Sequence, residues 1–137
     1  MMRTIFVVED NKHILRTITK ILSKIEGVEV RGFSSPTMAL IEAQEKHPDL
    51  VVTDMMMPVM NGVELVRALR KEGVEAQVIF VTAYPDVTYK KLLPENRVRT
   101  VIEKPPPLQK IMEEVTAALG NGEDGKGETR VLRRAQA

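Results

Sequence analysis

The 137-residue chain contains no cysteine and no tryptophan, and none of its hydrophobic runs is long. Without cysteine the protein can form neither a disulfide framework nor a thiolate metal site, which fits a reducing compartment. The apolar stretch Thr4–Val8 is too short for the hydrophobic core of a signal peptide, and Glu9 and Asp10 follow it directly. Because 20 basic residues stand against 19 acidic ones, the net charge of +1 draws neither nucleic acid nor anionic lipid to the protein. We therefore expect a cytoplasmic protein with no membrane contact and no direct nucleic acid binding.

Composition and length indicate a single folded domain followed by a tail. Hydrophobic residues make up 43% of the chain and charged residues 28%, as in ordinary globular proteins. Residues 120–137 differ, because they hold four of the eight glycines and show almost no apolar periodicity. We expect residues 1–119 to form the domain and residues 120–137 to be a disordered C-terminal tail.

Short β-branched runs alternate with stretches of helical periodicity along the domain. The runs predict strands at Thr4–Val8, Val28–Phe33, Leu50–Thr53, Gln77–Thr82 and Val98–Glu103. Helical spacing and cap signals predict helices that begin near Ile14, Ser35, Asn61, Asp86 and Leu108, the fourth ending at Leu93. This alternation predicts an α/β fold, a flavodoxin-like (βα)5 doubly wound five-stranded parallel sheet with strand order 2-1-3-4-5. Ligands of such sheets bind outside the carboxyl ends of strands 1 and 3.

Polar residues stand at the carboxyl ends of four predicted strands. Glu9 and Asp10 follow the first strand and Asp54 follows the third, so three carboxylates crowd one crevice. Like charges this close raise one another's pKa unless a cation neutralises them, and an all-oxygen pocket suits Mg²⁺. Thr82 and Lys104 supply a hydroxyl donor and a positive charge, which a transferring phosphoryl group needs. Asp54 is the candidate nucleophile, because an aspartate carboxylate can form an acyl phosphate.

These residues belong to four short motifs, each of which closes a predicted strand. The motifs are Glu9-Asp10, the D-x-x-M-P-x-M-N-G stretch Asp54 to Gly62, Thr82-Ala83 and Lys104-Pro105. With all four in this order, the chain resembles the CheY-like receiver domains of response regulators from two-component signal transduction. The resemblance covers Arg3 to about Leu119. It implies a phosphorelay protein and not a turnover enzyme that acts on an external substrate.

The resemblance implies a magnesium-dependent reaction in which Asp54 accepts a phosphoryl group from the phosphohistidine of a sensor histidine kinase or phosphotransfer protein. Asp10, Asp54 and the main-chain carbonyl of Met56 are the implied Mg²⁺ ligands, and Glu9 is implied to act mainly through bound water. The phosphorylated protein would then signal through contacts with a downstream protein target. A homodimer is an arrangement that the sequence leaves open.

The same resemblance assigns expected roles to the residues that end the later strands. Lys104 would pair with the acyl phosphate, and Thr82 would move to bond a phosphoryl oxygen. The small side chain of Ala83 leaves room for that group, and the peptide bond before Pro105 is expected to be cis. Val101 departs from the family, because receivers usually carry an aromatic residue three positions before the strand 5 lysine. This departure puts the usual coupling of that residue to the threonine in question.

Two bulky residues flank the expected phosphorylation site. Met56 stands two residues after Asp54, and Tyr84 stands two residues after Thr82. Neither side chain is acidic. We expect them to hinder an attacking water in line with the acyl phosphate, and so to prolong the phosphorylated state.

Two other functions are alternatives to phosphorelay signalling. A degenerate receiver would serve as a docking module that is never phosphorylated, and Val101 keeps this alternative open. A haloacid-dehalogenase-like phosphatase also forms an aspartyl phosphate, but it needs a second acid two residues after the nucleophile. Met56 stands at that position, which weighs against a phosphatase.

Overall fold

The computed structural model of the protein describes residues 2–85, 97–120 and 129–133. Its strands are β1 (Arg3–Val8), β2 (Val28–Phe33), β3 (Leu50–Asp54), β4 (Gln77–Thr82), β5 (Val98–Glu103) and β6 (Arg130–Leu132). Its helices are α1 (Lys12–Leu22), α2 (Pro36–Glu45), α3 (Gly62–Lys71) and α5 (Leu108–Gly120). The helix expected over Asp86–Leu93 lies outside the described residues.

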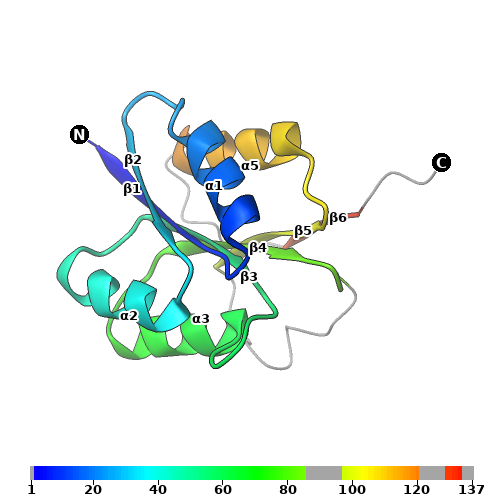
Figure 1. The fold of residues 1–137 in the computed structure, drawn as a ribbon. Helices are drawn as coiled ribbons and strands as arrows, with labels where there is room; N and C mark the ends of the chain where they lie inside the picture. Colours follow the sequence, from blue (N-terminus) through cyan, green and yellow to red (C-terminus); the bar gives the residue numbers. More distant parts are fainter. Residues whose placement is uncertain (1, 86–96, 121–128, 134–137) are drawn as a thin grey trace.

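The strands form one parallel sheet in the order β2-β1-β3-β4-β5-β6. Helices α1 and α5 cover one face of the sheet, and α2 and α3 cover the other (Figure 1). The predicted flavodoxin-like doubly wound sheet is confirmed, but the prediction of five strands is wrong, because β6 makes a sixth. This strand lies within residues 120–137, where we expected a disordered tail. A three-residue strand is too short for hydrophobic periodicity to reveal it.

The central strands are apolar on both sides because helices cover both faces of the sheet. Every residue of β3 and β4 is buried. Val7, Val52 and Ile79 belong to the core cluster that packs on α1 and α5. Phe6 and Val51 belong to the cluster that packs on α2 and α3. Burial of these apolar side chains from water stabilises the fold and holds the ends of β1 and β3 side by side.

Side-chain caps determine where the helices begin. Asn11 Oδ1 accepts hydrogen bonds from two backbone N–H groups in the first turn of α1, both at 3.0 Å. Ser35 caps α2, with Pro36 in its first turn as predicted, and Asn61 forms a capping box with Glu64 at the start of α3. Helix α1 therefore begins at Lys12, soon after β1 ends, and α3 begins at Gly62, after the loop that follows β3. No helix in the described parts of the chain is both long enough and apolar enough to cross a membrane.

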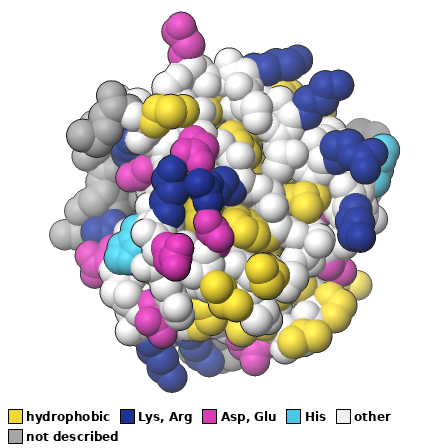
Figure 2. Space-filling model, turned by 60° about the vertical axis from the view of Figure 1, so that its left-hand side comes forward, with side chains coloured by type: hydrophobic (Ala, Val, Ile, Leu, Met, Phe, Trp, Pro, Cys, Tyr) yellow, Lys and Arg dark blue, Asp and Glu magenta, His cyan; other side chains and the backbone are white. Residues whose placement is uncertain are grey.

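Charged side chains lie along β2, the strand at one edge of the sheet. Arg31 forms ion pairs with Glu29, at 2.7 Å, and with Glu42 of α2. Lys46 pairs with Glu29 at 2.5 Å. Such exposed pairs contribute little stability, but charges on an edge strand hinder its pairing with another sheet. Figure 2 shows acidic and basic side chains interspersed on one face of the molecule, as expected from a net charge of +1.

Candidate functional site

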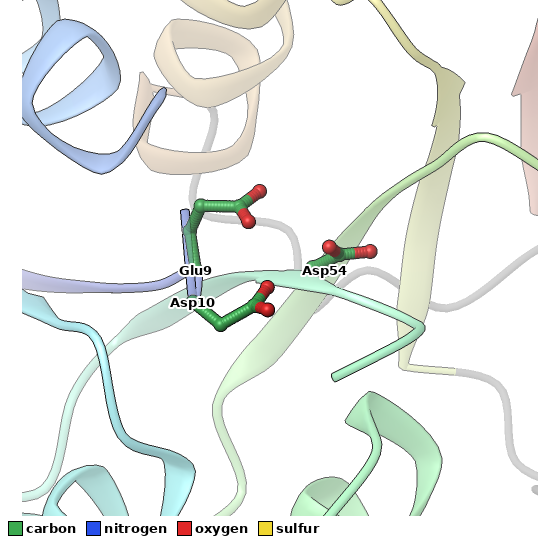
Figure 3. A group of neighbouring side chains, drawn as sticks. All are labelled: Glu9, Asp10 and Asp54. Carbon is green, nitrogen blue, oxygen red and sulfur yellow. The ribbon is translucent and has the colours of Figure 1, made fainter. Parts of the chain in front are cut away.

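The acidic residues singled out in the sequence meet at the carboxyl end of the sheet. Strands β1 and β3 are direct neighbours, with Val8 opposite Thr53. The residues that come next, Glu9 and Asp10 after β1 and Asp54 at the end of β3, therefore lie at the same edge. Figure 3 shows their three carboxylates gathered in one space.

The three carboxylates can each place one oxygen within 4.8 Å of the others. Glu9 is 2% exposed and Asp54 is 6% exposed, whereas Asp10 lies exposed at the mouth of the group. Three negative charges at this separation repel one another and favour a bound cation. Carboxylate oxygens with one side open to water match the preference of Mg²⁺ for hard oxygen ligands and retained waters. The donor set therefore fits Mg²⁺ better than the metals that select sulfur or imidazole.

Lys104 brings a positive charge into this group from just beyond the end of β5. Its Nζ lies 2.7 Å from Asp54 Oδ2 and 2.8 Å from Glu9 Oε1. Burial alone would lower the pKa of the Lys104 ammonium, but the hydrogen bonds to Asp54 and Glu9 outweigh burial, and the pKa is raised. Lys104 therefore stays charged at neutral pH and neutralises part of the acidic group.

Glu9 contacts Lys104 directly, and this pairing was not predicted from the sequence. Burial raises the pKa of the Glu9 carboxyl above its ordinary value, although the hydrogen bond from Lys104 opposes the shift. The backbone N–H of Asn11 donates to Glu9 Oε2 at 3.1 Å. Asn11 thus orients Glu9 as well as capping α1, a role that was not predicted from the sequence. An Asn directly before a helical period is the N-cap signal that could have found it.

The loop after β3 fixes Asp54 from the other side. The backbone N–H of Met56 donates to Asp54 Oδ1 at 3.1 Å, so both carboxylate oxygens have a hydrogen-bond partner. The loop then folds back, because the N–H of Gly62 donates to the carbonyl of Met55 at 2.9 Å. A Cβ atom at Gly62 would lie 2.4 Å from the main-chain oxygen of Asp54. Only glycine permits this close approach of the two backbone segments.

Thr82 ends β4, the strand next to β3, and its side chain is fully buried. Its hydroxyl accepts a hydrogen bond from the backbone N–H of Tyr84 at 3.0 Å. Among the described residues, no hydrogen bond joins this hydroxyl to Asp54 or Lys104. The main-chain oxygen of Thr82 does accept a hydrogen bond from the N–H of Lys104 at 2.8 Å. The structure therefore brings the three acids and Lys104 together, and it leaves the Thr82 hydroxyl outside their hydrogen-bonded group.

The remaining expected site residues differ in exposure. Met56 is 53% exposed and Tyr84 is 60% exposed, and Ala83 is exposed beside Tyr84. Val101 is fully buried in the core cluster that also contains Phe80. An aliphatic side chain thus fills the position at which receivers usually carry an aromatic one. The peptide bond before Pro105 is cis, as the resemblance implied.

The comparison with known protein families agrees with this geometry. Residues 5–116 match the family model described as the response regulator receiver domain. This match covers most of the chain. The chain belongs to the response regulator receiver family. Receiver domains of response regulators are signalling modules, and the match is to this family and not to haloacid-dehalogenase-like phosphatases.

Two curated relatives show different extents of similarity to this receiver. The DNA-binding response regulator MtrA of Mycobacterium tuberculosis is 30% identical over 128 residues, which cover 93% of this chain and 55% of MtrA. The chain thus spans about half the length of MtrA. The response regulator receiver protein CpdR of Brucella abortus is 29% identical over 86% of this chain and 98% of its own length. Because MtrA is named as DNA-binding, these relatives do not support the expectation that nucleic acid is not contacted.

Solved structures show the same fold. A response regulator receiver domain from Clostridium thermocellum is 30% identical, with a TM-score of 0.72 over 86% of this chain and 94% of that chain. The chemotaxis protein CheY4 of Vibrio cholerae has a TM-score of 0.76 over 87% of this chain and all of its own, at 24% identity. Because CheY4 is only 24% identical, its similarity bears on the fold alone. Both place this receiver among CheY-like α/β domains.

Proposed function

We propose that this receiver accepts a phosphoryl group on Asp54 from the phosphohistidine of a histidine kinase or phosphotransfer protein and signals through protein contacts. One observation carries the proposal. Lys104 Nζ lies 2.7 Å from an Asp54 carboxylate that two further acids, Glu9 and Asp10, approach within 4.8 Å. This arrangement combines a buried nucleophile, a cation for the incoming phosphoryl group and a set of ligands for a divalent ion.

In the proposed transfer, an oxygen of the Asp54 carboxylate forms a bond to phosphorus as the bond from phosphorus to the donor's histidine nitrogen breaks. The imidazole leaves with the electron pair and takes up a proton. Negative charge spreads over the phosphoryl oxygens in the transition state. Lys104 is placed to pair with that charge, and the N–H of Met56 keeps the carboxylate oriented.

The donor set supports Mg²⁺ as the metal of this reaction. Asp10, Asp54 and the main-chain carbonyl of Met56 would hold it, with Glu9 acting through bound water. When bound, Mg²⁺ supplies positive charge that offsets the carboxylates and the phosphoryl oxygens. Lys104 contacts Glu9 and Asp54, so it would share their negative charge with a bound ion.

A small phosphodonor tests the proposal without the unknown kinase. Incubation with Mg²⁺ and acetyl phosphate should give a single phosphoryl adduct by intact-mass spectrometry, and excess chelator should prevent it. The Asp54→Asn variant should give no adduct. A protein that folds normally and binds Mg²⁺ but never forms the adduct would instead fit the docking-module alternative. An adduct that persists in Asp54→Asn would place the chemistry elsewhere.

Mg²⁺ is expected to stabilise the protein in the absence of phosphate. At a free concentration about tenfold above its Kd, the ion should raise the free energy of unfolding by about 1.4 kcal/mol. Asp10→Asn should lose most of this increment, because it removes one of the charged ligands. Urea unfolding with and without Mg²⁺ measures the effect, and Glu45→Gln, an exposed acid on α2, is the matched control. Equal increments in the two variants would contradict the metal site.

The exposed side chains beside the site are expected to slow loss of the phosphoryl group. If Met56 and Tyr84 hinder the attacking water, the double variant Met56→Asn/Tyr84→Glu should lose phosphate about tenfold faster, equivalent to about 1.4 kcal/mol of barrier. The decay of the intact-mass adduct after removal of the donor gives the rate. A decay no faster than that of the wild type would refute the steric explanation.

A further inference from the structure

The outer edge of β5 is covered by residues 129–133, which we name the clasp. Within the clasp, β6 pairs parallel to β5, with Arg130 opposite Thr100 and Leu132 opposite Ile102. The family model matches residues 5–116, so the clasp lies beyond the part of the chain that defines a receiver. Its role must therefore be sought in its own contacts.

The side chains of Thr129, Arg130 and Leu132 help to hold the clasp in place. The Thr129 hydroxyl donates to the carbonyl of Val98 at 2.6 Å, and Leu132 packs against the core cluster beneath α1 and α5. Arg130 Nη1 donates to Glu114 of α5 at 2.7 Å, although the Arg130 side chain is 61% exposed. A three-residue strand with so little buried surface is easily released from a sheet.

Glu114 makes the Arg130 contact specific. Glu114 is 5% exposed, and one of its oxygens accepts a hydrogen bond from the hydroxyl of Thr100 at 2.6 Å. The other oxygen accepts from Arg130, which is the cation paired with Glu114 among the described residues. Without this partner, the Glu114 carboxylate would be a buried charge with no cation beside it, which is destabilising. The Arg130–Glu114 pair is thus the latch of the clasp.

Release of the clasp would leave β5 as a long open edge. Four of the six residues of β5 are β-branched, and these four, Val98, Thr100, Val101 and Ile102, are buried. An unpaired edge of this kind is a template for pairing with another chain. β6 replaces it with a shorter edge that carries an arginine, and both features hinder such pairing.

The edge of β5 is complementary to itself. Antiparallel pairing of two copies about Val101 would place Arg99 of each copy opposite Glu103 of the other. Opposite charges directly across two strands stabilise the pairing. Arg99 Nη1 donates to Gln77 Oε1 at 3.4 Å, whereas Arg99 Nε has no hydrogen-bond partner among the described residues, so an acidic side chain from a second copy would supply a partner for that one atom.

We infer that the outer edge of β5 is a self-association surface that the clasp covers within the same chain. With the clasp docked the protein is a monomer. With the clasp released, two copies pair their β5 strands antiparallel and form one continuous sheet. Phosphorylation of Asp54 is not required for this exchange, so the inference stands apart from the proposed function.

Two variants of the 137-residue chain release the clasp by different means. Arg130→Gln/Leu132→Ser removes the latch and the apolar anchor, and Val131→Pro prevents strand pairing by removing an N–H donor. The matched control, Lys110→Gln/Val131→Thr, also loses one positive charge and changes β6 but keeps every anchor. Light scattering after gel filtration gives the mass at rising concentration, and hydrogen exchange reports on residues 98–103 and 129–133.

Wild type and control should have the mass of one chain, with the clasp amides protected. Both release variants should exchange the clasp amides rapidly, double in mass as concentration rises, and gain protection along β5. Adding Arg99→Glu to a release variant should reduce dimerisation about tenfold, and Arg99→Glu/Glu103→Arg should restore it. The same results are expected with Asp54→Asn present. A released clasp on a monomeric chain, a clasp that stays protected in both variants, or a dimer without protection of β5 would each overturn the inference.

Discussion

Replacing Lys104 by methionine is expected to slow the phosphorylation of Asp54 by acetyl phosphate by about 10²- to 10³-fold. This is the usual loss when one preorganised donor to a developing negative charge is removed. Methionine keeps a long apolar side chain but cannot supply the charge that lies 2.7 Å from Asp54 Oδ2. The rate of adduct formation at saturating Mg²⁺ measures the loss. Lys110→Met, at an exposed position on α5, is the matched control, and equal rates in the two variants would contradict the role of Lys104.

The Lys104→Met variant should also be less stable at neutral pH, by roughly 2 kcal/mol, because Glu9 and Asp54 lose the cation that accompanies their burial. Without Lys104 the pKa of Glu9, which burial already raises, should rise further. An acid whose pKa is higher in the folded state contributes stability below its unfolded pKa and loses it as pH rises through the folded value. The loss of stability caused by Lys104→Met should therefore become smaller as the pH is lowered. A difference in stability between Lys104→Met and wild type that becomes larger at acid pH would contradict this prediction.

Gly62→Ala is expected to destabilise the protein by about 2 to 3 kcal/mol, as overpacking of a closely packed interior does. The added Cβ would lie 2.4 Å from the main-chain oxygen of Asp54 and 3.1 Å from a ring carbon of Phe80. The backbone that carries the phosphoacceptor must shift to relieve this contact. Phosphorylation should therefore slow together with the loss of stability measured by urea unfolding.

Gly120→Ala provides the control for this substitution. Among the described residues, no atom beyond its chain neighbours and the backbone of α5 lies within 4 Å of a Cβ at Gly120, the last residue of α5. Gly120→Ala should therefore change the stability of the protein by no more than about 0.5 kcal/mol. If Gly62→Ala behaved in the same way, the tight packing of the loop against Asp54 would be refuted.

Most of the fold could be predicted from the sequence because buried parallel strands are apolar runs that stop at polar site residues. The bounds of β2, β4 and β5 agree with the predicted ranges, and β1 and β3 are each one residue longer. The strand order then brings Asp10 and Asp54 to one edge without any knowledge of side-chain conformation. The gathering of the acids follows from backbone topology, which explains why it was predictable.

The contacts that were missed depend on side-chain conformation or on very short segments. The direct pairing of Glu9 with Lys104 joins two strand ends far apart in sequence, and no spacing rule reveals which oxygen the ammonium meets. The hydroxyl of Thr82, which is expected to move to a phosphoryl oxygen, accepts a hydrogen bond from the N–H of Tyr84, and local sequence does not reveal this contact. The strand β6 escaped prediction because pairing with β5 and a latch to Glu114 support it, and neither appears in local sequence.

The central claim is that the Asp54 carboxylate itself becomes the acyl phosphate. Borohydride reduction of the phosphorylated protein, followed by peptide mass spectrometry, marks the residue that carries the phosphoryl group. The account predicts one mark, at Asp54, that appears only when Mg²⁺ and phosphodonor are both present. A mark at Glu9 or Asp10, or a stable adduct with no reducible acyl phosphate, would contradict it.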